Sequence, residues 1–380
     1  NAALGSALSG QSSLLNVAGN LTLDGRLNVT DTGGFGAGVY RLIDYTGSLI
    51  NNGLTINTLP NGVQLSDVLL QTAVNNQVNL VVGGLGNVLF WDGSQVIGNG
   101  TVEGGYGVWE SGNSNWTNLN GTLNQNWNNT FAVFQGTPGN VVVNGAQTIS
   151  GLQFVSDGFA LNGGAGGQLL TSGTTIVRVD NGSTGTVGVA INGSGTLSKR
   201  DSGTLVLNGS NGYTGGTSLE GGTLVVGNNA ALGSGGLTTA AGTTLDSNTA
   251  VTLGNNTVLN GALAIGGSSA LTLDGVLSGV GSLTKNGSAN LTLNGLNTYS
   301  GGTVLAGGGL TLGNNGALSG GDLSVTGNAR LDSSSALQLA NNIGLGAQLT
   351  LVGTQNTSLS GAISGTGSLV KNGSGALVLS

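Results

Sequence analysis

Short blocks in which apolar and polar residues alternate recur along most of the chain, separated by Gly, Asn and Ser. Thr204-Leu-Val-Leu and Leu271-Thr-Leu are typical blocks. A period of two is typical of β-strands with one buried face, and Gly-Gly, Asn-Gly and Ser-Gly pairs supply the positive φ that tight corners need. Apolar residues at helical spacing are almost absent, so the pattern predicts an all-β protein.

These blocks belong to a longer repeat with a period of 86 residues. The segment at 195–199, Gly-Thr-Leu-Ser-Lys, returns as Gly-Ser-Leu-Thr-Lys at 281–285 and as Gly-Ser-Leu-Val-Lys at 367–371. The two complete copies and the partial third are 195–280, 281–366 and 367–380. Self-similarity at a fixed period favours stacked coils over a β-sandwich or a closed barrel.

We therefore expect a parallel β-helix, or solenoid, with roughly three short strands per coil. Four coils of roughly 21–22 residues would make one copy of the repeat, so Lys199, Lys285 and Lys371 would lie on one face, about 19 Å apart. Asn doublets such as Asn255-Asn256 are expected to stack as ladders on successive coils. The residues predicted to point inward are Leu205, Leu224, Leu245, Leu291, Leu310 and Leu331.

The composition excludes several classes of function. The chain has 380 residues, of which 76 are Gly, and it contains no Cys, Met or His. It therefore has no disulfides, no zinc site of the Cys/His kind, no thiol nucleophile and no histidine base. A net charge of −7 disfavours binding to nucleic acid or to an anionic membrane. With 38% hydrophobic residues and only 6% charged residues, the chain is predicted to fold.

The repeated residues resemble a known family. The pattern Gly-Ser-Gly-Thr-Leu-x-Lys, followed by Gly-x-Asn-x-Tyr-Thr-Gly-Gly-Thr and Val-Gly-Asn-Asn, is similar to the autotransporter-associated β-strand repeat. The similarity is close at 195–240 and 281–322 and begins again at 367. Further segments that resemble autotransporter passengers are 35–45, 71–80 and 87–93. The resemblance implies a right-handed parallel β-helix in the secreted passenger of a Gram-negative type V secretion protein.

The resemblance also implies a cellular location and a function. It indicates a structural or adhesive segment, a rigid stalk displayed outside the outer membrane at the cell surface. A whole family member carries a signal peptide and a C-terminal membrane barrel, and neither is seen in this sequence. We therefore expect a piece of a longer protein, whose membrane attachment would come only through that barrel.

One segment differs from the rest of the chain. Residues 90–134 hold eight of the fifteen aromatic residues and all four Trp, set among many Asn. Aromatic faces beside amides and carboxylates commonly stack on sugars and hydrogen-bond them. The candidate ligand contacts are Trp91, Tyr106, Trp109, Trp116 and Trp127. The alternative is that these rings pack a local element or a junction at which the coil register breaks.

The chain is accordingly divided into a β-helical segment at 1–82, a Trp- and Asn-rich insertion or junction at 83–140, and a repeat-bearing β-helix at 141–380. We predict no catalytic residue, no metal site and no cofactor. The carboxylates form no local pair such as Asp-x-Asp, and the calcium-binding nonapeptide, the EF-hand loop and the P-loop are missing.

Three classes of function stay open, with an enzyme ranked last. The first is the rigid stalk or adhesin segment. The second is a module that binds carbohydrate or the surface of a host or neighbouring cell through the aromatic segment. The third is a self-assembling extracellular fibre or matrix component that associates through the solenoid ends or faces.

Overall fold

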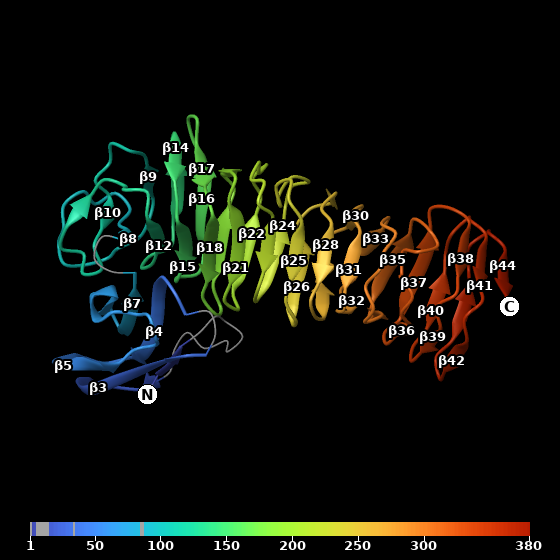
Figure 1. Ribbon diagram of the computed structural model, residues 1–380, viewed down its shortest axis with the longest axis horizontal. Helices are drawn as coiled ribbons and strands as arrows, with labels where there is room; N and C mark the ends of the chain where they lie inside the picture. The colour runs from blue at the N-terminus through green and yellow to red at the C-terminus, as the bar shows by residue number, and fades with distance from the viewer. Residues whose placement is uncertain (1, 5–14, 33–34, 84–86) are drawn as a thin grey trace. The chain divides into compact units, whose positions relative to one another are not determined.

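The computed structural model describes residues 2–4, 15–32, 35–83 and 87–380. The described residues form β-strands and one short 3-10 turn, η2 (Leu65–Asp67), without an α-helix (Figure 1). No helix among them is long and apolar enough to cross a membrane. The chain divides into two compact units, Asn1–Leu205 and Val206–Ser380, with the boundary inside β22 (Thr204–Leu207).

The C-terminal unit is a stack of coils whose strands pair in parallel with strands about twenty residues further along. Its first face is a seven-stranded sheet, named here the β33 sheet. The strands of the β33 sheet are β27 (Val251–Leu253), β30 (Leu271–Leu273), β33 (Asn290–Leu293), β35 (Gly308–Leu312), β37 (Ala329–Ser333), β40 (Leu349–Leu351) and β43 (Leu369–Lys371). In Figure 1 these strands follow one another through the yellow-to-red part of the ribbon.

Two further faces complete each coil of this unit. The second face, named here the β32 sheet, consists of β24 (Thr223–Val226), β26 (Thr243–Ser247), β29 (Leu263–Ile265), β32 (Leu283–Lys285), β34 (Thr303–Leu305), β36 (Leu323–Val325), β39 (Ile343–Leu345) and β42 (Ile363–Gly365). The third face consists of β23 (Thr217–Leu219), β25 (Leu237–Thr239), β28 (Thr257–Leu259) and β31 (Leu277–Gly279), and, further along the chain, β38 (Leu337–Leu339), β41 (Thr357–Leu359) and β44 (Leu377–Leu379). The predicted all-β parallel solenoid with three short strands per coil is confirmed.

The inward rows of Leu form the core of the coils. Leu291 pairs with Leu310, which pairs with Leu331, so like side chains lie over one another in register. All six leucines predicted to point inward are buried, none more than 2% exposed. Period-two alternation in strands this short was enough to identify the buried face, because every second side chain points the same way.

The single row of lysines expected from the 86-residue repeat is wrong. Lys285 lies in the β32 sheet and pairs with Leu305, whereas Lys371 lies in the β33 sheet and pairs with Leu351. Because a coil takes about twenty residues, 86 residues make four coils and about a third of another. Equivalent residues in successive copies therefore advance by one face of the coil.

The lysines of the repeat are corner residues, and the side chains of Lys199 and Lys285 are buried. Lys285 is fully buried, and its Nζ donates to the carbonyls of Asn286 and Gly287 at the corner that follows β32. Lys371 donates in the same way to the carbonyl of Gly373. Burial lowers the pKa of Lys285, an effect partly opposed by the charge of Asp246. The sequence pattern indicated a corner or solubility role, and the corner role is the one found.

The Asn doublets act differently from the stacked ladders that we expected. The amide of Asn255 donates to the carbonyls of Gly233 and Gly235 in the preceding coil. The oxygen of Asn256 accepts from the Val276 N–H in the following coil. The Asn255-Asn256 doublet thus binds the main chain on both sides, which satisfies corner groups that no strand pairing reaches.

The coils of the N-terminal unit run from 131 to 205 and also pair in parallel. One face contains β12 (Phe131–Phe134), β15 (Gly151–Phe154), β18 (Thr174–Val179) and β21 (Thr196–Arg200). The other faces contain β13 (Asn140–Val143), β16 (Phe159–Gly163) and β19 (Thr184–Val187), and β14 (Ala146–Thr148), β17 (Gln168–Thr171) and β20 (Ala190–Gly193). Lys199 lies in β21, where its Nζ donates to the carbonyls of Arg200 and Asp201.

The described part of 1–82 differs from the parallel coils expected there. β7 (Gln77–Val82) pairs antiparallel with both β4 (Gly38–Tyr45) and β6 (Val68–Gln71). β6 and β7 are joined by a turn in which Asn76 has a φ of 65°, and a connection this short allows only antiparallel pairing. The remaining strands are β1 (Ala2–Leu4), β2 (Leu15–Val17), β3 (Leu21–Asp31) and β5 (Leu49–Thr58), which pair in parallel as β1 with β3, β3 with β5 and β2 with β4.

Candidate functional site

The aromatic segment is an insertion between two strands that are neighbours in the sheet. β8 (Val88–Trp91) pairs in parallel with β12, more than forty residues further along instead of about twenty. Between them, β10 (Trp116–Thr117) pairs antiparallel with β8 and with β11 (Asn124–Gln125). β9 (Gly107–Trp109) pairs in parallel with β13. The insertion thus covers the edge that β8 would otherwise leave open.

The four tryptophans gather into one buried cluster beneath this insertion. Trp91, Trp109 and Trp116 are fully buried and Trp127 is 8% exposed. The ring centroids of Trp109 and Trp116 are 4.8 Å apart, and those of Trp116 and Trp127 are 4.5 Å apart. The ring centroid of Phe134 lies 5.8 Å from that of Trp116, and Phe134 connects the cluster to the coils. Edge and tilted ring packing of this kind adds to the stabilisation from burial.

Tyr106 is the exception among the five candidate ligand contacts. Its side chain is 72% exposed, so it is the one candidate ring that presents a face to solvent. The structure brings the four indoles together and leaves Tyr106 apart from them. The sequence could not separate these cases, because Tyr106 and Trp109 lie in the same turn-rich stretch.

The polar side chains of the insertion are bonded mainly to its own main chain. Asn115 donates to the carbonyls of Gly93 and Val108. Asp92 is fully buried and accepts from the Glu103 N–H at 2.9 Å and from the Asn124 amide at 2.8 Å. Burial raises the pKa of Asp92 to about 6, although these two hydrogen bonds oppose the shift. Amides that suggested sugar recognition therefore hold the loops of the insertion in place.

A second cluster, which sequence reasoning missed, joins β4 to the coils of the same unit. We name it the β4 clamp; its members are Tyr40, Gln153, Arg178, Asp180 and Asp201. Arg178 forms a bidentate ion pair with Asp201, with N–O distances of 2.8 and 3.1 Å. Its guanidinium also donates to the Tyr40 hydroxyl and lies 4.2 Å from the centroid of that ring.

Gln153 holds the main chain of β4 as a neighbouring strand would. Its amide donates to the Val39 carbonyl at 2.8 Å, and its oxygen accepts from the Val39 N–H at 2.7 Å. The same amide donates to Asp180. The one signal in the sequence was Arg178 and Asp180 in the otherwise apolar run 176–180, because charged residues are rarely buried unless they are paired.

Groups of the β4 clamp, and Lys199 beside Asp201, have strongly shifted pKa values. Burial, assisted by the charge of Asp201, raises the pKa of Asp180 to about 7. Burial lowers the pKa of Lys199 to about 7, against the attraction of Asp201. Burial would also lower the pKa of Arg178, but the charges of Asp201 and Tyr40 outweigh it and raise that pKa. The groups of the clamp face one another.

No group of three His, Cys, Asp or Glu side chains that could hold a metal ion occurs in the part of the chain that the structure describes. The acidic residues of the β4 clamp are instead neutralised by Arg178 and by hydrogen bonds. The arrangement in both clusters is typical of packing and fastening.

The repeat that recurs in this solenoid matches a family described as the Passenger-associated-transport-repeat, at 197–226 and 283–312. In the structure the second match begins at β32 and contains a corner built on Asn297. The oxygen of Asn297 accepts from the Leu277 N–H, and its amide donates to the Ala317 carbonyl, twenty residues away on either side. Tyr299 is buried beside it with its hydroxyl bonded to Thr303.

The chain is also similar to a curated protein, "Adhesin BmaC autotransporter" of Brucella suis biovar 1 (strain 1330). The two are 39% identical over 358 residues, which is 87% of this chain and 10% of the relative. The chain thus spans about a tenth of the length of that relative. No solved structure matches the chain.

Stacked parallel coils with passenger-associated corners define a class, the β-solenoid passengers of secreted surface proteins. The chain is an autotransporter passenger region, exposed outside a Gram-negative bacterium at the cell surface. The family predicted from the repeated residues is therefore confirmed.

Proposed function

We propose that this passenger region is a rigid adhesive stalk, which holds a binding surface away from the outer membrane and catalyses no reaction. The observation that carries the proposal is the unbroken parallel register of the C-terminal unit, in which each coil is hydrogen-bonded to the next. In such a stack, length grows with the number of coils while every coil needs only its neighbours. The adhesin name of the similar protein supports an adhesive role.

The adhesive role is tested with beads coated with the purified 380-residue chain. Beads that carry the chain should attach to host or neighbouring cells, and soluble chain should compete for that attachment. The control beads carry an unrelated β-solenoid of similar length and charge. Attachment no greater than that of the control beads would remove the adhesive part of the proposal and leave a spacer.

Carbohydrate binding through the aromatic segment is a second candidate. Since the four indoles are buried, it depends on Tyr106 as the ring that a sugar can reach. A glycan array probed with the chain and with the Tyr106→Ala variant tests it, because the exposed side chain can be removed without disturbing the core. Identical array patterns for the two proteins would rule out this contact.

We also propose that 83–140 is a junction between the segment at 1–82 and the coils at 141–205. Two hydrogen bonds support this role. Gln71 donates from its side chain to the Leu119 carbonyl at 2.8 Å, and Gln135 donates to the side chain of Gln77 at 3.1 Å. Limited proteolysis should then release 1–82 from a variant in which Gln71 and Gln77 are both replaced by Leu, and leave the parent chain intact.

Self-association through coil faces or ends is a separate proposal for partners of this chain. Sedimentation velocity over a hundredfold range of concentration tests it. A constant sedimentation coefficient would exclude self-association of the isolated region.

A further inference from the structure

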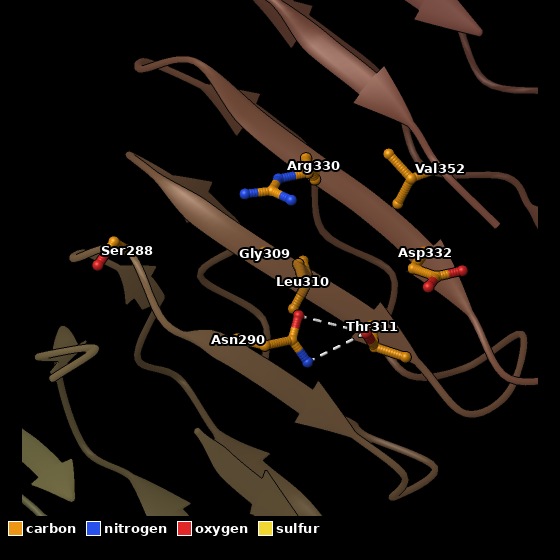
Figure 2. Close-up of a pocket in the computed structure, with 8 residues that line it drawn as sticks. All are labelled: Ser288, Asn290, Gly309, Leu310, Thr311, Arg330, Asp332 and Val352. Atoms are coloured by element: carbon orange, nitrogen blue, oxygen red, sulfur yellow. Dashed lines mark hydrogen bonds between the residues drawn. The ribbon is translucent and has the colours of Figure 1, made fainter. Parts of the chain in front are cut away.

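The outward face of the β33 sheet contains a hollow that the stalk role does not use. Asn290, Gly309 and Arg330 are aligned across β33, β35 and β37 by the parallel register. Because Gly309 has no side chain, the Asn290 side chain lies against its backbone, with Asn290 Oδ1 close to where a Cβ would stand. A hollow of about 240 Å³ opens beside these residues. Figure 2 shows Asn290 and Arg330 on opposite sides of Gly309, with Asp332 at one end of the hollow.

The hollow continues across the strands in the direction in which the coils stack. A second hollow of about 500 Å³ shares Ser288, Arg330 and Val352 with the first. It adds Gln348, Thr350 and Asn372 to the lining. Together the two hollows form one groove, named here the Arg330 groove, whose size is within the range of small-molecule sites, about 300–1,000 Å³.

Arg330 is the one cation in this unit with a charged group free to bind a ligand. Residues 206–380, all of which the structure describes, contain Lys285, Arg330 and Lys371 as their only basic residues. The two lysines donate to corner carbonyls. Arg330 is exposed and makes no ion pair or hydrogen bond within this unit. A free guanidinium offers a planar fork that fits a carboxylate with two parallel hydrogen bonds.

The rest of the lining suits hydroxyl groups. The amide of Asn290 is held by the hydroxyls of Thr292 and Thr311, each at 3.1 Å, so its position is fixed before a ligand arrives. One oxygen of Asp332 accepts from the Ser333 N–H at 2.7 Å, which leaves the other oxygen to accept from a ligand hydroxyl. Gln348 and Thr350 add a further amide and hydroxyl.

We propose that the Arg330 groove binds a carboxylate-bearing oligosaccharide, with the carboxylate on Arg330 and sugar hydroxyls against Asp332, Gln348 and Thr350. A peptide partner is disfavoured because the lining has no aromatic side chain and no apolar pocket of the kind that anchors protein interfaces. Nucleic acid is disfavoured because a single cation in a chain of net charge −7 cannot neutralise a run of phosphates. The inference goes beyond the stalk role, which would stand without it.

Calorimetric titration of the whole chain with two matched pairs of probes tests the proposal. The first pair is trigalacturonate and its methyl ester, and the second is sialyllactose and lactose, so the two arms distinguish a uronic acid from a sialic acid. In at least one pair, the acidic member should bind and the neutral member should not. Binding should weaken as salt is raised, because the contact is exposed and ionic.

Three variants locate the binding. Arg330→Gln should weaken the affinity for the acidic probe at least about tenfold, the usual worth of a charge-assisted contact. Thr350→Val should also weaken it, because the change removes a hydroxyl group that lines the groove. Arg26→Gln, which removes an exposed arginine from the other unit, is the matched control and should leave the affinity unchanged. Unfolding curves of all three should match that of the parent chain.

The proposal is overturned by any of four results: no binding of either acidic probe, equal binding of the neutral partners, unchanged affinity in Arg330→Gln, or an equal loss in Arg26→Gln. The assay with coated beads separates sugar binding by the groove from adhesion to cells. If Arg330→Gln loses the sugar but its beads still attach to cells, the groove binds sugar and adhesion uses another surface.

Discussion

The coils at 206–380 and the segment at 15–134 bury apolar strands by different means. In the coils, leucines repeat at about twenty-residue intervals, and in the β33 sheet most of them lie over another Leu or Val. In 15–134, strands pair in both directions and the core around β8 and β10 is built from tryptophan and phenylalanine rings. The coils can lengthen by repetition, whereas the aromatic core is a single, unrepeated packing arrangement. A repeat can therefore be read from its period, but the insertion depends on contacts between residues far apart in sequence.

The two regions can be followed separately, which makes the comparison testable. All four tryptophans lie between Trp91 and Trp127, so tryptophan fluorescence reports on the insertion alone. Far-ultraviolet circular dichroism is dominated by the strands of the coils.

The largest effect is expected from Trp116→Ala. Trp116 is fully buried and contacts three other aromatic rings of the cluster, Trp91, Trp109 and Trp127. Removing a buried Trp side chain usually costs about 3–5 kcal/mol. In urea, the fluorescence transition should move to lower concentration while the circular dichroism transition of the coils changes little. Tyr106→Ala is the control, since exposed substitutions stay within about 0.5 kcal/mol. Equal shifts of both signals in Trp116→Ala would show that the two regions unfold together.

Leu291→Ala is the corresponding change in the coils and should reverse the pattern. Leu291 is fully buried in the β33 sheet, between Leu271 and Leu310. The expected cost is about 2–5 kcal/mol, confined to neighbouring coils. Circular dichroism should then show an additional early step, while tryptophan fluorescence keeps its midpoint.

Lys285→Ala is a second test in the same stack of coils, in the neighbouring β32 sheet. The sequence alone suggested that charge changes would matter little, but the burial of Lys285 changes that expectation. Its removal leaves the carbonyls of the exposed residues Asn286 and Gly287 without their donor. The expected loss is therefore the net worth of a hydrogen bond, about 0.5–1.5 kcal/mol. A loss below about 0.5 kcal/mol would show that water replaces the ammonium group.

A further effect is expected from pH, and in the N-terminal unit it depends on Asp180 and Lys199. The pKa of Asp180 is raised to about 7, so the folded state holds a proton that the unfolded state releases above about 4. Stability should therefore fall as pH rises from 4 to 7, by at most about 1.4 kcal/mol per pH unit. The pKa of Lys199 is lowered to about 7, so stability should rise again between pH 7 and 10 as the unfolded lysine loses its extra proton.

Urea midpoints measured by fluorescence between pH 4 and 10 test this minimum near pH 7. Asp180→Asn keeps an acceptor for Gln153 and removes the titration, so it should flatten the fall between pH 4 and 7. Lys199→Met should flatten the rise. Asp180 faces Gln153, Arg178 and Asp201 of the β4 clamp, and it also interacts with Arg41. Asp92 changes the free energy of unfolding in the same direction as Asp180 up to about pH 6. A monotonic profile in the parent chain would contradict the assignment.

The sequence was sufficient for the coils because their information is local and repeated. Alternation identified Leu291 and Leu310 as inward, and the offset of 86 residues revealed the repeat. The sequence did not place Lys199, Lys285 and Lys371 on the correct faces. The 86-residue period is not a whole number of coils, and nothing in the repeat alone gives the length of a coil. Only the pairing of Leu271 with Leu291 supplies it.

The sites depend on contacts that a linear reading cannot give. Tyr40 and Arg178 are 138 residues apart, and the β4 clamp exists only because β4 packs on the coils of its unit. The aromatic segment was visible as a composition change, but burial of its indoles depends on the antiparallel pairing of β8 with β10. The Arg330 groove depends on the alignment of Asn290, Gly309 and Arg330 across three strands, and in the sequence Gly309 is indistinguishable from any other Gly in the repeats.

The smallest effect is expected from the deletion of a whole coil, and this experiment tests the comparison most directly. Removing 257–276 deletes β28, β29 and β30 and joins Asn256 to Leu277. Val251, which pairs with Leu271 in the parent chain, would then face Leu291, so the inward row stays continuous. Because each coil needs only its neighbours, the free energy of unfolding measured by urea titration should remain within about 0.5 kcal/mol of the parent value.

The matched control is a deletion of 257–266, which is half a coil. Val251 would then face Gly281, and inward leucines would meet corner residues. The adjoining coils should lose at least the worth of one buried Leu, about 2–5 kcal/mol, and circular dichroism should report the loss. No deletion of this kind should be tolerated within 92–130, which lies between β8 and β12 and does not follow the twenty-residue repeat. If the whole-coil and half-coil deletions proved equally damaging, the coils would share the unrepeated packing of the aromatic segment, and the stalk could not lengthen by repetition.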